Sequence, residues 1–203
     1  MSAVATPDDV LTFWFGHADP TSAPSVDTSR WWMSTPAFDA DIAARFGATM
    51  EAARDGTLGH WLEAPTTALA LVIVCDQFPR NVHRGTSDAF AWDARARDIA
   101  RHIESKGWAD AWDISAASFA LMPFEHSEDR TDQAHSVAAF QRLADRQPAA
   151  KRASAQNLVG YAIKHKAIID RFGRFPHRND AMGRETTAEE SAWLNGGGDR
   201  FGQ

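Results

Sequence analysis

Apolar residues recur at helical spacing along most of the chain. The first such stretch begins at Thr6, an N-cap type of residue followed by a proline and two acids, and it ends at Gly16. The second begins at Ser34-Thr35-Pro36, and its apolar face ends near Asp55. Residues 17–30, between the two, are rich in Pro, Ser, Thr and Asp, which is typical of a loop. The pattern predicts two amphipathic helices joined by this loop.

The run from Ala68 to Phe78 is apolar on every side until Asp76. This pattern fits a buried strand as well as a buried helix, and no second convincing strand is available as a partner, so a helix is favoured. A helix that is apolar all round must be central. We therefore expect Ala68–Cys75 to lie in the core of the domain. We also expect Pro79 to end this helix.

Five further stretches complete an all-helical pattern. They run from Ser87 to Gly107, from Asp113 or Ser115 to Met122, from Ser127 to Asp145, from Ala149 to Phe172 and from Thr186 to Gly196. Pro123 is expected to kink or end the second of them. The sequence predicts an all-α fold of about eight or nine helices, stacked as antiparallel pairs. We expect a single domain over residues 1–203, with loose ends at 1–5 and 196–203.

Composition narrows the class of protein. The 203 residues carry a formal net charge of -6, whereas a nucleic-acid-binding protein is usually basic. Cys75 is the one cysteine, so an internal disulfide and a cysteine-based metal cluster are excluded. The N-terminus does not resemble a secretory signal, and the longest apolar run is too short to span a bilayer. We expect a cytoplasmic protein that binds neither nucleic acid nor membranes.

Two polar stretches, 76–86 and 171–184, echo one another. Each follows an apolar helix and contains Phe-Pro, then Arg and Asn, with Gly nearby. Similar turn chemistry at two helix ends would explain the echo. Alternatively, both stretches face one pocket and hold a carboxylate or phosphate, because a guanidinium group can donate two parallel hydrogen bonds to such an anion. The candidate ligand-binding residues here are Gln77, Arg80, Asn81, His83, Arg84, Arg174, Arg178, Asn179 and Arg184.

This pocket hypothesis makes a geometric prediction. If the two stretches share a pocket, Arg80 or Arg84 lies near Arg174 or Arg178. Salt bridges to the neighbouring carboxylates would use the same arginines, so a purely structural role stays open. Asp76 follows the most apolar segment and is expected to be buried, ionised and bonded to one of these arginines, because an unpaired buried charge is costly.

Residues 125–129 place carboxylates beside an imidazole. Glu125 and Asp129 are four residues apart, so on one helix they would share a face suited to acid–base chemistry or to a hard metal ion. Alternatively, Ser127 caps a helix whose first turn holds the acids. We expect no zinc site, because no regular histidine spacing accompanies these residues. The candidate catalytic residues of the chain are Asp76, Glu125, His126 and His177.

His165 and the tryptophans each allow two interpretations. His165 lies on an apolar helix face, so it is either a hydrogen-bonded core residue or a base lining a pocket, and we include it with Asp129 among the candidate ligand-binding residues. Trp14, Trp31, Trp32, Trp61 and Trp92 are predicted mainly as core, although they could line a pocket.

Five motifs together resemble a known family. These are residues 10–16 (VLTFWFG), 30–32 (RWW), 76–81 (DQFPRN), 125–129 (EHSED) and 171–179 (RFGRFPHRN). In this order they resemble the bacterial family catalogued as Domain of Unknown Function 924, over about residues 10–201. The resemblance implies a tetratricopeptide-like stacking of helices and no established activity, catalytic residue or cofactor. A 34-residue repeat consensus is not visible, so peptide binding does not follow from the fold class.

Three functions remain open at this point. The protein is a small-molecule binding protein or enzyme for an anionic ligand, a helical module that takes a peptide or protein partner in a groove, or a structural protein with buried salt bridges. Convergence of the polar residues on one concave site favours the first. An exposed apolar groove favours the second, and complete mutual pairing favours the third.

Overall fold

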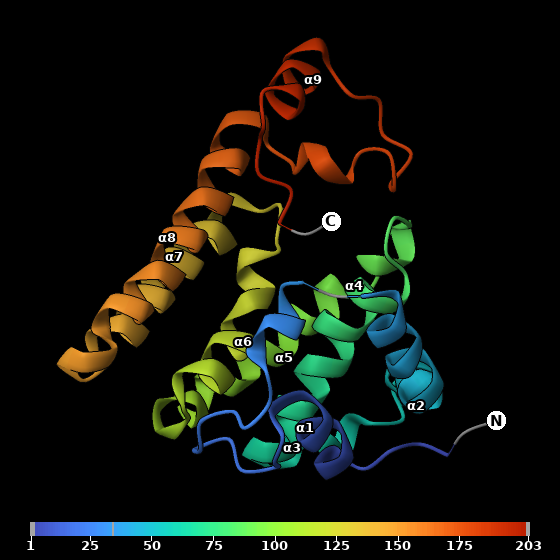
Figure 1. Cartoon of the computed structure of the whole chain (residues 1–203), viewed down its shortest axis with the longest axis vertical. Helices are drawn as coiled ribbons and strands as arrows, with labels where there is room; N and C mark the ends of the chain where they lie inside the picture. The colour runs from blue at the N-terminus through green and yellow to red at the C-terminus, as the bar shows by residue number, and fades with distance from the viewer. Residues whose placement is uncertain (1–2, 34, 202–203) are drawn as a thin grey trace.

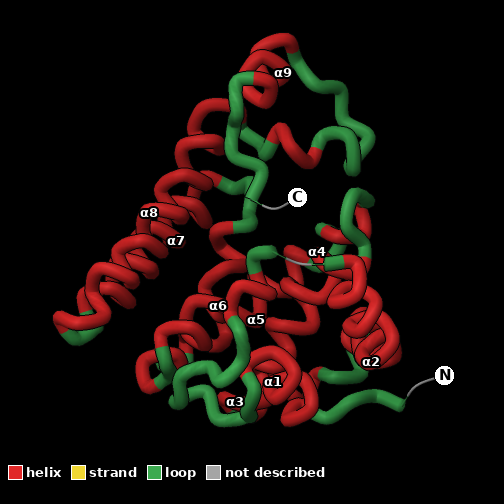
Figure 2. The backbone as a smooth tube through the Cα atoms, in the orientation of Figure 1, coloured by secondary structure: helices red, strands yellow, loops and turns green. Residues whose placement is uncertain are grey.

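In the computed structural model, residues 3–33 and 35–201 are described, and they form helices and loops without a strand (Figure 1, Figure 2). The predicted all-α class is confirmed. Two short segments, α3 and α4, belong to one continuous rod, so nine α-helical segments make eight helices. The segments are α1 (Pro7–Phe15), α2 (Pro36–Arg54), α3 (Pro65–Val72), α4 (Phe78–Val82), α5 (Asp93–Ser105), α6 (Ile114–Glu125), α7 (Arg130–Asp145), α8 (Ala149–Phe172) and α9 (Ala188–Asn195).

Several of the predicted start signals form helix caps. Thr6 accepts a hydrogen bond from the backbone N–H of Asp9, whose carboxylate accepts one from the backbone N–H of Thr6, which closes a capping box. Thr35 caps α2 by accepting a hydrogen bond from the backbone N–H of Phe38, while Ser34 lies outside the described residues. Gly16 ends α1 in the left-handed conformation, at φ 89°.

The central rod crosses the molecule from α3 through a π-helical turn, Ile73–Gln77, into α4. In this turn the backbone N–H of Phe78 donates to the carbonyl of Ile73, five residues earlier. The prediction that Pro79 ends the helix is therefore wrong. A proline ring clashes with the carbonyl four residues earlier in a regular α-helix, and a wider turn at that point relieves the clash.

Ala68–Cys75 forms the buried centre, as predicted. The rod packs against α1, α2, α5 and α6, which surround it. Aromatic rings fill the spaces between these helices, and their centroids lie 4.9 Å apart for Phe46 and Phe78 and 5.5 Å apart for Trp14 and Phe119. Offset and edge-to-face ring pairs of this kind add to the stability that burial supplies.

α7 and α8 form a long hairpin that leans against α6 and extends to one side of the molecule (Figure 1). Beyond α8, a second, smaller apolar cluster of Ile168, Ile169 and Phe175 packs with Trp193 and Phe201. The described part of the expected loose tail, 196–201, is thus anchored on α8. Phe175 of this cluster belongs to the second Phe-Pro stretch, which lies near the start of α5 through the ion pair of Arg178 with Asp93.

Three helix boundaries differ from the predictions. Ser87 begins only a short 3-10 turn, and α5 starts at Asp93, a buried residue that is held by tertiary ion pairs. α6 continues through Pro123 to Glu125, because a proline near the helix end removes only one intrahelical hydrogen bond. Asp129, and not Ser127, caps α7, since its carboxylate accepts from the N–H groups of Thr131 and Asp132.

Candidate functional site

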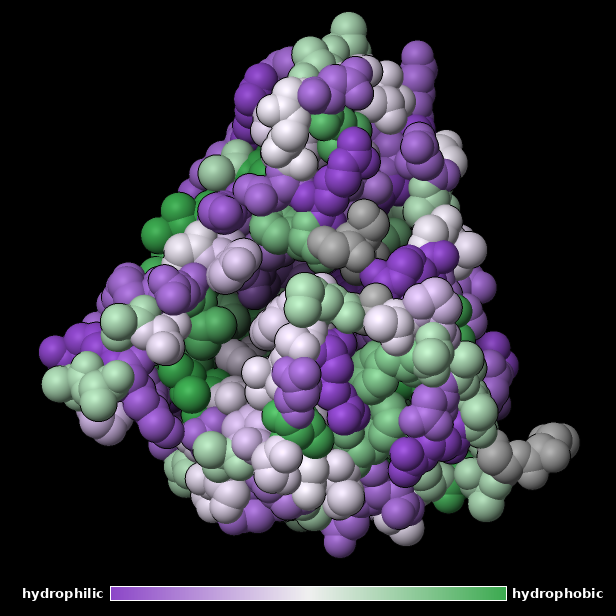
Figure 3. Space-filling model, viewed as in Figure 1, coloured by the Kyte–Doolittle hydropathy of each residue, from purple (hydrophilic) through white to green (hydrophobic). Residues whose placement is uncertain are grey.

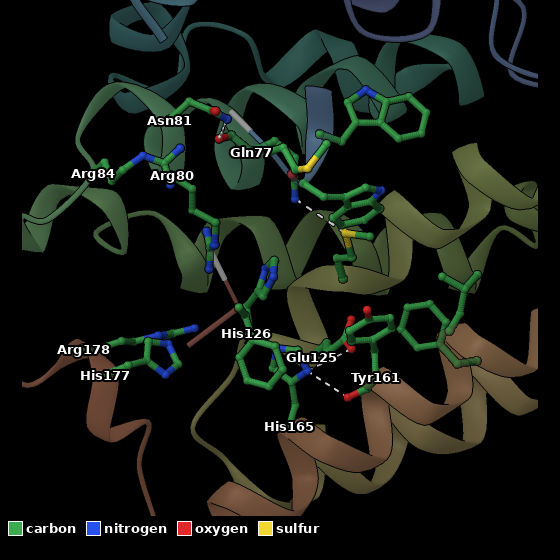
Figure 4. A pocket seen from close by; sticks show the side chains of 17 residues that line it. Gln77, Arg80, Asn81, Arg84, Glu125, His126, Tyr161, His165, His177 and Arg178 are labelled. Carbon is green, nitrogen blue, oxygen red and sulfur yellow. Dashed lines mark hydrogen bonds and ion pairs between the residues drawn. The ribbon is translucent and has the colours of Figure 1, made fainter. Parts of the chain in front are cut away.

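A cavity of about 660 Å³ lies between the central rod and α6 on one side and α8 with the C-terminal segment on the other. Figure 3 shows the hollow between the α7–α8 hairpin and the body of the molecule, with hydrophobic surface beside it. Figure 4 shows the side chains that enter it. One part of the wall is charged or polar, and it contains Gln77, Arg80, Asn81, Glu125, His126, His165, His177 and Arg178.

Asp76 lies directly beneath this wall, fully buried, and accepts several hydrogen bonds. Its Oδ1 lies 2.9 Å from Nδ1 of His126, and its Oδ2 accepts from Nε2 of Gln77 at 2.6 Å. Nη1 of Arg80 lies 3.4 Å from Oδ1 and also donates to the Asp76 carbonyl at 2.7 Å. Burial alone would raise the pKa of Asp76, but Arg80 and His126 outweigh it and lower the pKa to about 2. The expected buried, ionised and arginine-bonded Asp76 is what the structure contains.

His126 ends α6, and its ring lines the cavity. An ionised carboxylate only accepts hydrogen bonds, so the proton between the two side chains belongs to Nδ1 of His126, and Nε2 is left as an acceptor. Burial, followed by the positive charge of Arg80, lowers the pKa of His126. His126 is therefore a neutral base at neutral pH, oriented by Asp76 as catalytic imidazoles commonly are by a carboxylate.

Asp93, a residue that the sequence analysis missed, joins the two Phe-Pro stretches. Its carboxylate lies 2.9 Å from Nη2 of Arg80 and 3.4 Å from Nη1 of Arg178. The expected approach of the first stretch to the second thus occurs, and a shared carboxylate mediates it. The only sequence signal for Asp93 was an acid near a helix start.

Arg178 is buried between two aromatic rings. Its guanidinium carbon lies 4.6 Å from the ring centre of Phe90 and 4.4 Å from that of Phe175. Burial, followed by repulsion from Arg80, lowers the pKa of Arg178 to about 10, so it stays charged at neutral pH. Its Nε is buried and has no hydrogen-bond partner among the described residues.

His177 precedes Arg178 and lines the same part of the cavity (Figure 4). Burial and the neighbouring Arg178 lower its pKa to about 3, so the ring is neutral at neutral pH. Its Nδ1 is buried and likewise lacks a hydrogen-bond partner in the described chain. Six other buried side-chain nitrogens of the described residues also lack a hydrogen-bond partner, and they lie outside the cavity wall, so what distinguishes Arg178 and His177 is their position at the cavity.

Glu125 and His165 form a second carboxylate–imidazole contact. Nδ1 of His165 lies 2.9 Å from the Tyr161 carbonyl and 3.0 Å from Oε1 of Glu125. The carbonyl is the better-aligned acceptor, which leaves Oε1 of Glu125 buried without a hydrogen bond from the described residues. The Phe201 ring stacks on His165 at 3.6 Å. His165 therefore both packs in the interior and lines the cavity.

The other part of the cavity wall is apolar. It is formed by Trp31, Trp32, Met33, Met122, Phe140, Leu158, Tyr161 and Phe201. Trp31 and Trp32 both contact the ring of Phe119, at 4.9 and 6.1 Å between ring centres. The prediction that these tryptophans belong to the core is wrong for Trp32, which stays 57% exposed at the cavity.

Several of the candidate ligand-binding residues form ion pairs with other side chains or lie at helix ends. Arg84 reaches the cavity wall and pairs with Asp39, at 3.4 Å. Arg174 pairs with Glu190 and Arg184 with Glu128, at 2.6 and 2.7 Å, and neither arginine lines the cavity. Three more candidates lie outside the cavity wall. His83 ends α4, and Asp129 caps α7. The side-chain amide of Asn179 donates hydrogen bonds to Thr186 and Glu190.

The expected shared helix face of Glu125 and Asp129 is also wrong, because α6 ends at Glu125 and α7 begins after Asp129. Among the described residues, no three His, Cys, Asp or Glu side chains are grouped so that they could hold a metal ion. Within the same residues, every helix is too short or too polar to cross a membrane.

Comparison with known proteins places the chain in a family. The model of a bacterial family of proteins of unknown function, DUF924, matches residues 10–198. The chain belongs to this family. A solved structure of a protein of unknown function from Agrobacterium tumefaciens is similar to the family member described here, with 35% identity and a TM-score of 0.75 over 94% of this chain and 97% of that one. The search of curated proteins found no match to the present chain. The tetratricopeptide-like stacking that the resemblance implied stays a prediction.

Proposed function

We propose that this protein binds a small anionic molecule in the cavity and that His126 exchanges a proton with it. The observation that carries the proposal is that Arg178 and His177 line one cavity and that each has a buried nitrogen, Nε and Nδ1, without a hydrogen-bond partner among the described residues. A carboxylate or phosphate oxygen would satisfy such groups. The proposal assigns binding to Arg178 and His177.

The acid–base part rests on the Asp76–His126 pair. Asp76 holds the proton on Nδ1 and thereby leaves Nε2 of a cavity-lining ring available as a base. When a nearby ligand gives up a proton, the imidazolium that forms is stabilised by the ionised carboxylate at 2.9 Å. Gln77 and Arg80 keep Asp76 in place for this role.

The polar residues divide between two of the roles that the sequence left open. Asp76, Arg80, Glu125, His126, His177 and Arg178 converge on the cavity or lie directly beneath its wall, which favours a small-molecule site. Arg174 and Arg184 pair with carboxylates elsewhere, as structural residues do. The same motifs therefore contain residues at the cavity and residues in ion pairs away from it.

Thermal unfolding in matched salts tests the proposal. Phosphate or acetate is expected to raise Tm above its value in chloride at equal ionic strength, because a ligand that binds only the folded state stabilises it. Each kcal/mol of binding energy raises the Tm of a chain of this size by about 2–4 °C. Arg178→Gln should remove the rise, whereas Arg171→Gln, which removes an exposed ion pair with Glu189, should retain it. Equal Tm values in the three salts would contradict the proposal.

A further inference from the structure

Building on the proposed function, we propose that the ligand is an organic monoacid with an apolar body, such as an arylalkyl carboxylate. Its carboxylate lies at the Arg178 end of the cavity. Its body lies against the wall formed by Trp31, Trp32 and Phe140. Two separate features carry this inference: the charge balance around Arg178, and the exposed apolar side chains on both sides of the cavity mouth.

The charge balance limits the charge of the ligand. Arg80 and Arg178 face two carboxylates, Asp76 and Asp93, so these four buried groups sum to zero. Arg80 has both carboxylates within 3.4 Å, whereas Arg178 pairs, within the described part of the chain, with the shared Asp93 alone. One further carboxylate can use the remaining donors of Arg178. A dianion or polyphosphate would place excess negative charge beside buried carboxylates in a poorly hydrated site, which is costly.

Glu125 sets the orientation of such an acid. Its carboxylate lies on the α8 side of the cavity, between Tyr161 and His165 (Figure 4). A ligand carboxylate is repelled by this like charge and is attracted by the guanidinium of Arg178. The two groups therefore point the acidic end of the ligand away from α8, toward the second Phe-Pro stretch.

The mouth of the cavity supplies an apolar surface for the body. Trp32 and Met33 approach it from the loop before α2, and Tyr161 approaches it from α8. Exposed fractions are 70% for Met33 and 53% for Tyr161, which is high for large apolar side chains. Trp32 stacks nearly parallel to Phe119, with an interplanar angle of 8°, and its other face is a flat apolar surface at the mouth. An aryl or alkyl group fits such a surface.

Titration calorimetry with four probes tests the inference. The probes are 3-phenylpropionate, the matched alcohol 3-phenylpropanol, acetate and inorganic phosphate. We expect 3-phenylpropionate to bind at least about tenfold more tightly than each of the others, since it alone combines one charge with an aryl body. Trp32→Ala should weaken 3-phenylpropionate by about tenfold and leave acetate unchanged. Met182→Ala, an exposed apolar residue outside the cavity wall, should change neither.

The outcomes separate this inference from the proposed function. If phosphate or acetate binds as tightly as 3-phenylpropionate, and Arg178→Gln abolishes that binding, the anion site stands and the monoacid inference is overturned. If none of the probes binds, both are overturned. A short peptide ending in phenylalanine that binds more tightly than 3-phenylpropionate would make the occupant a peptide terminus, and the free acid would be rejected.

Discussion

At the scale of single residues, Asp76 determines the character of the site. It is fully buried, yet it stays ionised because Arg80, His126 and Gln77 surround its carboxylate. The sequence could predict its burial and its arginine, because an acid that directly follows an apolar run needs a cationic partner. It could not predict His126, which lies fifty residues away and meets Asp76 only through tertiary packing.

Asp76→Asn is expected to lower the free energy of unfolding at neutral pH by about 2–4 kcal/mol, because Arg80 keeps its buried charge while losing one of its two carboxylate partners. The lowered pKa of Asp76 stabilises the folded state above pH about 4, and this contribution is lost as the pH falls toward 2. Equilibrium denaturation at several pH values measures both effects. Asp98→Asn, at an exposed ion pair, is the control. A change at Asp76 below about 0.5 kcal/mol would reject the structural pairing.

The lowered pKa of His177 also makes the folded state less stable as the pH falls, over a higher pH range than that of Asp76. The pKa of His177 is about 3 in the folded chain, so the unfolded chain takes up the proton first as the pH falls below 6.5. Between pH 7 and 5 this is expected to cost the native protein about 2 kcal/mol of unfolding free energy. His177→Asn should reduce that loss, while His60→Asn, at an exposed position, should not. The same pH slope in native protein and His177→Asn would contradict a neutral His177 in the folded chain.

At the scale of elements, the helix starts and the central rod were predictable from the sequence, because caps and apolar periodicity are local signals. The continuation of the rod through Pro79 was not, since the π turn that accommodates the proline is stabilised by packing on all sides. The start of α5 at Asp93 has the same explanation: its first residue is held by Arg80 and Arg178, which come from other parts of the chain.

The second Phe-Pro stretch depends on Glu128. The carboxylate of Glu128 binds Arg184 with two hydrogen bonds, at 2.7 and 3.0 Å, and accepts the backbone N–H of Phe175 at 2.8 Å. Glu128→Gln should therefore loosen residues 175–184, by about 1–3 kcal/mol of local opening energy. Hydrogen exchange is expected to quicken there and to stay unchanged in α3.

The matched control for that experiment is Glu189→Gln, at an exposed pair with Arg171. Exchange that quickens equally over the whole chain would mean that Glu128 supports global stability and not the segment that carries His177 and Arg178. Unchanged exchange would mean that the two hydrogen bonds between Glu128 and Arg184 contribute nothing measurable to the stability of residues 175–184.

At the scale of the whole molecule, the cavity exists because two apolar clusters are built from different parts of the chain. The rod belongs to the main core, whereas Ile169 and Phe175 belong to the smaller cluster beyond α8. The sequence indicated which motifs would contribute polar groups, because they interrupt the helical pattern. It did not indicate that Arg174 and Arg184 would pair elsewhere, or that Trp32 and Tyr161 would line the same cavity, since both depend on tertiary packing.

The central claim is that His126 is a neutral, Asp76-oriented base in a ligand cavity. Nitrogen-15 NMR of the histidine rings at pH 7, during titration with 3-phenylpropionate, tests it most directly. We predict that His126 is neutral with its proton on Nδ1, and that His126, His165 and His177 shift saturably while His17 and His60 do not. A charged His126, a proton on Nε2, or shifts that fail to distinguish these two groups of histidines would contradict the claim.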